Sequence, residues 1–168
     1  MAPRVILIGP MGSGKTTIGK AVARKLQLTF RDTDHVIEER EKLSISEIFL
    51  EKGEEKFRLI EKAVLRDELL SDETVLALGG GAPISVDAQS ALRAISSRIY
   101  YLDVSLATVA PRIGFNRDRP LLLHNPRGQW QTLMEARRPI YESLADKVID
   151  ANKMSEKEIV AFIVEELS

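Results

Sequence analysis

The sequence contains no cysteine, which excludes disulfide bonds, thiolate zinc sites and cysteine nucleophiles. It also lacks long hydrophobic runs, because no stretch approaches the roughly 18 apolar residues that a membrane span needs. The apolar run at residues 5–8 is too short for the hydrophobic part of a signal peptide. We therefore expect a soluble, cytoplasmic protein that has no membrane partner.

An excess of charge of one sign is absent as well. The 24 basic and 25 acidic residues give a formal net charge of −1, so there is no global field to attract nucleic acid or an anionic membrane. Any site for an anion must therefore be local. The 168 residues suit one compact domain, and we expect a monomer.

Short apolar runs alternate with helical spacing along the whole chain. Strands are predicted near residues 5–8, 28–30, 74–78, 99–102 and 147–149. Helices are predicted near residues 15–26, 36–42, 44–53, 54–70, 86–95 and 105–113, from about 130 to an interruption at Pro139, and over 155–167. Residues 114–128 lose the apolar periodicity and predict a mobile surface loop. The alternation predicts a three-layer α/β fold with a parallel sheet covered on both faces.

Residues 9–16, GPMGSGKT, satisfy the phosphate-loop pattern G-x-x-x-x-G-K-[ST]. Its glycines let backbone N–H groups surround phosphate oxygens, and the following helix adds the partial positive charge of its N-terminus. Lys15 would reach the β- and γ-phosphates of ATP, and the Thr16 hydroxyl would coordinate Mg²⁺. The alternative, a glycine-rich turn without a ligand, is disfavoured because the motif lies between a strand and a helix. The expected nucleotide-binding residues here are Gly12, Ser13, Gly14, Lys15, Thr16 and Thr17.

Two aspartates, Asp32 and Asp34, follow the second predicted strand. Their spacing lets both carboxylates point to the side of the phosphate loop. One carboxylate could hold Mg²⁺ while the other accepts the proton of a substrate hydroxyl. The alternative is a helix N-cap, a position that aspartate fills well.

Arg58 and the glycine triplet at residues 79–81 each allow two interpretations. Arg58 has Glu61 one helical turn away, and an exposed ion pair of that spacing is the simpler explanation. The triplet ends a buried strand, where backbone can approach a ligand closely, but it could equally be a tight turn.

Nucleotide binding alone leaves three classes of protein open: a switch, a transporter ATPase and a kinase.

Taken together, these motifs resemble those of shikimate kinases over essentially the whole chain. The order is the phosphate loop, Asp32-Thr33-Asp34, Phe57-Arg58-x-x-Glu61, Gly79-Gly80-Gly81, Arg119-Pro120-Leu121-Leu122 and Arg137. The resemblance implies a P-loop NTPase fold like that of nucleoside monophosphate kinases, with a five-stranded parallel sheet. It divides this single kinase domain, residues 1–168, into a phosphate loop (9–16), a substrate-binding helical region (about 33–70) and a lid (about 114–128).

The resemblance implies a phosphotransferase that uses ATP to phosphorylate the 3-hydroxyl of shikimate, a step toward chorismate and aromatic amino acids. On the nucleotide side, Lys15 and Arg119 match catalytic residues, Thr16 and Asp32 match the metal site, and Arg112 matches the residue that stacks on adenine.

On the acceptor side, Asp34 matches the residue that binds shikimate hydroxyls and acts as base. Arg58 and Arg137 match the two arginines that grip the carboxylate, Glu61 matches the acid that holds Arg58, and the residues of the triplet, Gly79, Gly80 and Gly81, match backbone contacts.

Some features depart from the family's pattern or leave a rival open. Arg117 is an additional arginine in the lid, and Asn152-Lys153-Met154 stand where a second adenine contact is expected. His35 and His124 match no functional position, and we expect both to be exposed bystanders. The rivals are a kinase of gluconate or of a nucleoside monophosphate on the same fold, and a nucleotide-dependent switch.

Overall fold

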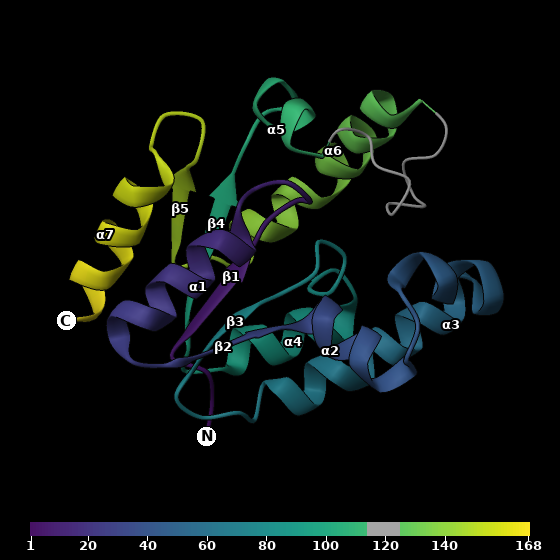
Figure 1. Cartoon of the computed structure of the whole chain (residues 1–168), viewed down its shortest axis with the longest axis horizontal. Coiled ribbons are helices and arrows are strands. Elements are labelled where there is room, and N and C mark those ends of the chain that lie inside the picture. The colour runs from purple at the N-terminus through teal and green to yellow at the C-terminus, as the bar shows by residue number, and fades with distance from the viewer. Residues whose placement is uncertain (114–124) are drawn as a thin grey trace.

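The structure, a computed structural model, describes residues 1–113 and 125–168 (Figure 1). Five strands form one sheet: β1 (Val5–Ile8), β2 (Thr29–Asp32), β3 (Thr74–Ala77), β4 (Arg98–Asp103) and β5 (Lys147–Asp150). The helices of the described residues are α1 (Lys15–Leu26), α2 (Thr33–Glu41), α3 (Ile45–Glu68), α4 (Val86–Ala94), α5 (Leu106–Ile113), α6 (Pro126–Leu144) and α7 (Glu156–Leu167). The predicted α/β fold with a five-stranded parallel sheet is confirmed.

The strand order is β2-β3-β1-β4-β5, and all neighbouring strands are parallel. The connection from β1 to β2 runs in one direction across the sheet, and the later connections run in the other. Because such crossovers are right-handed, the two directions place their helices on opposite faces. Helices α1 and α7 lie side by side on one face, and α4 and α6 pack together on the other (Figure 1). The loops after β1, β2 and β3 therefore meet at one edge.

The chain has a main core and a smaller second one. Strands β1 and β3 are buried throughout. The apolar runs at residues 5–8 and 75–78 predict this burial. The second cluster lies between α2 and α3 and consists of Val36, Ile37, Ile48, Phe57 and Val64. The helical region at residues 33–70 is thus held by its own apolar contacts.

Local signals set several helix ends. Ser44 and Glu47 form a reciprocal capping box at the start of α3, and Ser155 and Glu158 form another at the start of α7. The break predicted near Gly53 is present as a kink inside α3, where Gly53 has φ 82° and ψ 167°. That conformation is open to glycine and very costly for other residues.

Two expectations about residues 126–144 were wrong. The helix predicted to stop at Pro139 continues through it, because α6 runs from Pro126 to Leu144. A proline costs one internal hydrogen bond, but the buried side chains of Trp130, Met134 and Tyr141 hold the helix against the sheet on both sides of it. Residues 126–128, assigned to the lid loop, form the first turn of α6, capped by Asn125. The rest of the predicted lid, residues 114–124, lies outside the described residues.

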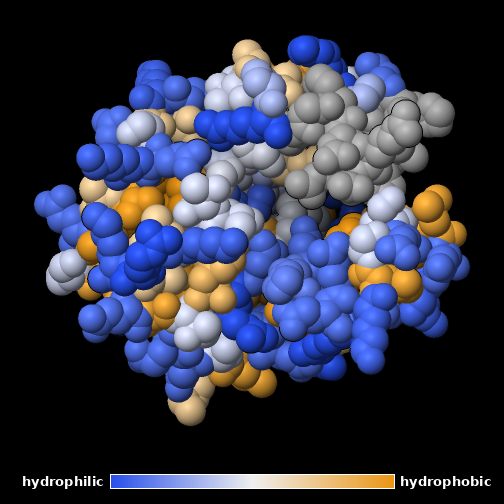
Figure 2. Space-filling model, viewed as in Figure 1, coloured by the Kyte–Doolittle hydropathy of each residue, from blue (hydrophilic) through white to orange (hydrophobic). Residues whose placement is uncertain are grey.

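The surface is mostly hydrophilic on the face seen in Figure 2, with small scattered apolar patches. Within residues 1–113 and 125–168, no helix combines the length and the apolar character needed to cross a membrane.

Candidate active site

The phosphate loop joins β1 to α1 at the carboxyl edge of the sheet. Lys15 folds back over the loop, and its Nζ donates to the carbonyl oxygens of Gly9 (2.8 Å) and Pro10 (2.9 Å). Gly9 has φ 149°, and a Cβ there would lie 2.8 Å from the carbonyl oxygen of Leu102. A side chain at this position would force the loop away from β4.

The start of α1 is left open to an anion. Its N-cap residue, Gly14, has a left-handed φ of 97° and offers no side-chain cap, and the first turn holds no acidic residue. The first N–H groups of a helix have no partner within the helix and carry partial positive charge. The loop and the helix start therefore provide what a phosphate group requires.

Asp32 connects the phosphate loop to α2. Its Oδ2 accepts a hydrogen bond from the Thr16 hydroxyl (3.0 Å), and its Oδ1 accepts one from the backbone N–H of Asp34 (2.9 Å). Asp32 is thus the N-cap of α2, as the alternative interpretation proposed, and it also contacts the phosphate loop. A hydroxyl and a carboxylate oxygen side by side are the hard ligands that suit Mg²⁺. No group of three His, Asp or Glu residues suited to a metal occurs in the described part of the chain.

Three charged side chains from three helices converge on the glycine triplet after β3. A Cβ on Gly79 would collide with the Asp34 carboxylate, and one on Gly81 would collide with the Arg58 guanidinium. Arg137 approaches from α6, because its Nη2 would lie 3.1 Å from a Cβ on Gly81. A side chain at Gly79 or Gly81 would displace these groups, so the triplet is more than a tight turn.

Arg58 is held in place by Glu61 and Phe57. Its Nη1 donates to Oε1 of Glu61 at 2.8 Å, and its Cζ lies 5.2 Å from the centroid of the Phe57 ring. Glu61 is only 5% exposed, so the pair is not the surface pair that the spacing suggested. Burial raises the pKa of the Glu61 carboxyl, and the charge of Arg58 opposes that rise.

All of these groups face one cleft with a volume of about 390 Å³. It lies between the phosphate loop, α2, α3 and α6. Of the predicted site residues, those that line it are Gly12, Gly14, Lys15, Thr16, Thr17, Asp32, Asp34, Arg58, Glu61, Gly79, Gly80, Gly81 and Arg137.

Two predicted residues of the described part of the chain, Ser13 and Arg112, do not line this cleft. Ser13 is buried within the loop, and Arg112 reaches from α5 to donate to the carbonyl oxygen of Gly12 at 3.0 Å. Arg117, Arg119 and His124 fall outside the described residues.

Comparison with known proteins identifies the family. The family model described as shikimate kinase matches residues 11–168. The chain belongs to the shikimate kinase family. It is 42% identical to the shikimate kinase of Streptomyces coelicolor over 94% of this chain and 91% of that one. The structure of shikimate kinase from Acinetobacter baumannii in complex with shikimate superposes with a TM-score of 0.93 at 32% identity, covering 99% of this chain and 93% of that one.

A more distant likeness shows the fold alone. The gluconokinase of Sinorhizobium meliloti superposes with a TM-score of 0.59 at 18% identity, covering 99% of this chain and 95% of that one. The architecture thus extends beyond the shikimate kinase family, and the side chains in the cleft must distinguish the acceptors.

The structure also adds residues that sequence reasoning missed in this shikimate kinase family member. Met11, Glu38, Ile45, Phe49 and Phe57 line the cleft. So does His35, which was expected to be a bystander; it is exposed, and its Nε2 lies 3.0 Å from the Glu39 carboxylate. Met11 and Phe57 stand inside motifs that the sequence already shows, and this position was the signal that could have found them. His35, Glu38, Ile45 and Phe49 belong to no motif, so no local signal could have found them.

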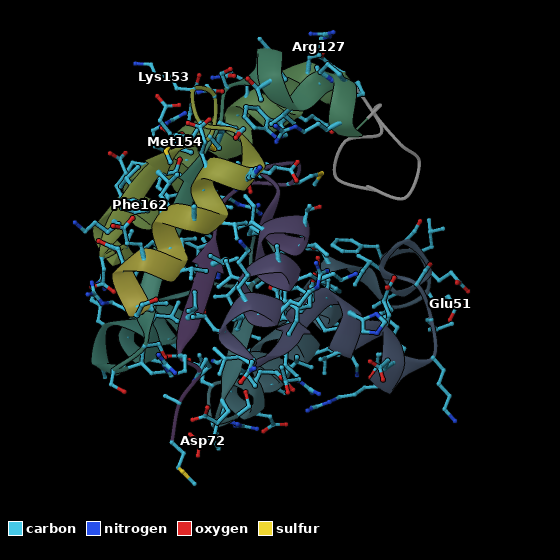
Figure 3. All side chains as sticks on the ribbon, turned by 60° about the vertical axis from the view of Figure 1, so that its left-hand side comes forward. Glu51, Asp72, Arg127, Lys153, Met154 and Phe162 are labelled. Atoms are coloured by element: carbon cyan, nitrogen blue, oxygen red, sulfur yellow. The ribbon has the colours of Figure 1, made fainter. Side chains whose placement is uncertain are left out.

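The turn at residues 152–154 supports α5. Oδ1 of Asn152 accepts hydrogen bonds from the Ser105 N–H (2.9 Å) and the Thr108 hydroxyl (2.8 Å). Lys153 and Met154 follow at the turn between β5 and α7, on the side of the molecule opposite Glu51 in the view of Figure 3. In this shikimate kinase family member, the turn thus fixes the helix that carries Arg112.

Proposed function

We propose that this member of the shikimate kinase family transfers the γ-phosphate of ATP to the 3-hydroxyl of shikimate, giving shikimate 3-phosphate and ADP on the way to chorismate. The observation that carries the proposal is the convergence of Asp34, Arg58 and Arg137 on the glycine triplet, in the same cleft as the phosphate loop. One carboxylate and two guanidinium groups suit an acceptor that has both hydroxyl groups and a carboxylate.

On the nucleotide side, the loop N–H groups and the start of α1 bind the β- and γ-phosphates, and Lys15 neutralises charge on the transferred group. Thr16 and Asp32 would hold Mg²⁺, which neutralises further charge on the phosphate oxygens when bound. Arg112 faces the adenine, and Arg119, outside the described residues, is proposed to approach the transferred phosphate.

On the acceptor side, Asp34 orients the 3-hydroxyl and takes its proton. The hydroxyl oxygen forms a bond to the γ-phosphorus as the bond between that phosphorus and the bridging oxygen of ADP breaks. Arg58 and Arg137 bind the carboxylate at the other end of the ring, and the N–H groups of Gly80 and Gly81 approach the ring between these ends. The protein thus contributes positioning and charge rather than covalent chemistry.

The rival acceptors are gluconate and a nucleoside monophosphate. Gluconate also has a carboxylate and hydroxyl groups, but it is an open chain, whereas the cleft has fixed groups at both ends. A nucleotide-dependent switch would need no acceptor at all, and the paired arginines beside the triplet would have no role.

The test is the release of ADP from ATP in a coupled assay with no acceptor, shikimate, gluconate or a nucleoside monophosphate. We expect rapid release with shikimate and only slow release in the other three arms. Equal release without an acceptor would support a switch, and faster release with gluconate or the nucleotide would assign the cleft to that acceptor. Lys15→Ala, which removes the cation of the phosphate loop, is the inactive control.

A further inference from the structure

Helix α6 donates a hydrogen bond to each of two loops that form the cleft. Near its start, Nε1 of Trp130 donates to the carbonyl oxygen of Met11 in the phosphate loop at 3.2 Å. Near its end, the Tyr141 hydroxyl donates to the carbonyl oxygen of Gly80 in the glycine triplet at 2.7 Å. The two donors are three helical turns apart, so they lie on one face of α6 with their Cα atoms roughly 16 Å from each other.

Both donors are fixed by burial. Trp130 is 3% exposed and Tyr141 is fully buried. The Tyr141 ring packs on Tyr101, with centroids 5.1 Å apart. Arg138, the neighbour of Arg137 on α6, donates to Asp103 at the end of β4 at 2.6 Å. An ion pair therefore joins α6 to the sheet between its two donors. Neither donor can move unless the side chains packed around it move as well.

At the triplet, the hydrogen bond from Tyr141 gives the last backbone carbonyl a donor. The Gly79 N–H donates to the Thr33 hydroxyl, and the carbonyls of Gly79 and Gly81 accept bonds from the residues that follow the turn. The Gly80 carbonyl is taken by Tyr141. Among the described residues, the N–H groups of Gly80 and Gly81 have no protein acceptor, and both glycines line the cleft. Because the C=O and N–H of a trans peptide point in opposite directions, fixing the Gly80 carbonyl also fixes the direction of the Gly81 N–H.

In the phosphate loop, too, side chains bind backbone carbonyl oxygens. Trp130 holds the Met11 carbonyl, and Arg112 holds the next one, that of Gly12. Carbonyl oxygens that are bound to donors of α5 and α6 cannot turn toward the phosphates, where they would repel them. These contacts keep the Met11 and Gly12 carbonyls away from the nucleotide in a loop whose Ser13 N–H donates to the Pro10 carbonyl at 3.2 Å.

We propose that Trp130 and Tyr141 are positioning residues through which one helix sets the two halves of the site separately: Trp130 orients the phosphate loop, and Tyr141 orients the acceptor turn. The inference rests on the proposed function for the identity of the acceptor. It adds two side chains that touch neither substrate.

The experiment compares Trp130→Phe and Tyr141→Phe, which retain an aromatic ring and lose the donor. Tyr100→Phe is the matched control, because Tyr100 is equally buried but donates to Glu166 on α7, away from the cleft. We measure kcat, KM for each substrate and the unfolding temperature. Trp130→Phe should raise KM for ATP roughly three- to tenfold and leave KM for shikimate within twofold. Tyr141→Phe should raise KM for shikimate by the same factor and leave KM for ATP within twofold. A factor of this size corresponds to the loss of one hydrogen bond. The control should change neither.

Two results would overturn the proposal: a fall in unfolding temperature with both KM values unchanged, or an equal change of both KM values in either variant. A second measurement needs no variant. Trp130 is the only tryptophan, so its indole N–H gives one signal in a ¹H–¹⁵N spectrum. A non-hydrolysable ATP analogue should shift that signal, and shikimate alone should shift the amide signals of Gly80 and Gly81 instead. Indole and glycine signals that respond alike to both ligands would also refute it.

Failure of the proposed function is separable from failure of this inference. If wild type releases no ADP with shikimate, the acceptor is wrong, but the effect of Trp130→Phe on nucleotide affinity still decides the phosphate-loop half. If wild type is active and the KM values do not divide as stated, the function stands and the positioning role is refuted.

Discussion

Arg58 and Glu61 form a pair in which the carboxylate is buried and the guanidinium faces the cleft. The side chain of Glu61 is 6% exposed and that of Arg58 is 31% exposed, with 2.8 Å between Oε1 and Nη1. Glu61 accepts from one edge of the guanidinium, and the other N–H groups can face an incoming carboxylate. A pair of this kind orients a binding group, whereas a fully exposed pair contributes little.

Replacing either Arg58 or Arg137 by lysine should weaken shikimate binding roughly ten- to a hundredfold, because an ammonium cannot reproduce the paired N–H donors. ATP affinity should be nearly unchanged. Shikimate methyl ester should bind wild type as poorly as shikimate binds the variants. Arg40→Lys is the matched control, because Arg40 pairs with Asp67 at 2.9 Å outside the cleft. If wild type bound the ester as well as the acid, the carboxylate role of both arginines would be wrong.

The buried Glu61 makes stability depend on pH. Its pKa in the folded protein is raised above the usual 4.5 by burial, so the folded state disfavours the charged form. As pH rises from 4.5 through the raised pKa, wild type should lose free energy of unfolding relative to Glu61→Gln, which cannot ionise. Chemical unfolding at several pH values between 4 and 7 measures this difference. A difference that stayed constant over that range would mean that Glu61 has an ordinary pKa.

Asp34→Asn keeps the size of the side chain and removes the proton acceptor. We expect kcat to fall about 10²–10⁴-fold, the usual contribution of general-base catalysis, with a smaller change in KM for shikimate. Asp67→Asn, at the exposed pair with Arg40, should be close to wild type. If only KM for shikimate rose, Asp34 would be a binding group and the base would be another residue.

The glycine triplet should tolerate alanine unequally. At Gly79 and Gly81 a methyl group would collide with the Asp34 carboxylate and the Arg58 guanidinium, whereas at Gly80 the nearest atom, Nη1 of Arg137, is 3.3 Å away. Gly79→Ala and Gly81→Ala should therefore reduce shikimate affinity more than Gly80→Ala, with ATP affinity retained in all three. Calorimetric titration with each ligand measures this order. Equal losses at the three positions would show that the turn itself, and not these side chains, is what alanine disturbs.

Local signals in the sequence were enough to predict the sheet and the phosphate loop. A strand buried on both faces needs a continuous apolar run, as residues 5–8 have, and a capping box needs only Ser44 and Glu47 three positions apart. The prediction failed at Pro139, where the local cost of a proline is outweighed by contacts with the sheet. The apolar positions of α6 were visible in the sequence, but the surface they pack on was not.

The amino-acid sequence by itself determined which elements form and where the phosphate-loop motif lies, because those properties depend on neighbours along the chain. Only the tertiary structure decided that Glu61 is buried, that Asp34 and Arg58 close over the glycine triplet, and that Trp130 and Tyr141 hold two loops of one cleft. These contacts join residues as far apart as Met11 and Trp130. The parallel order of β2, β3, β1 and β4 brings them together, since it places the ends of strands that are distant in sequence at one edge of the sheet.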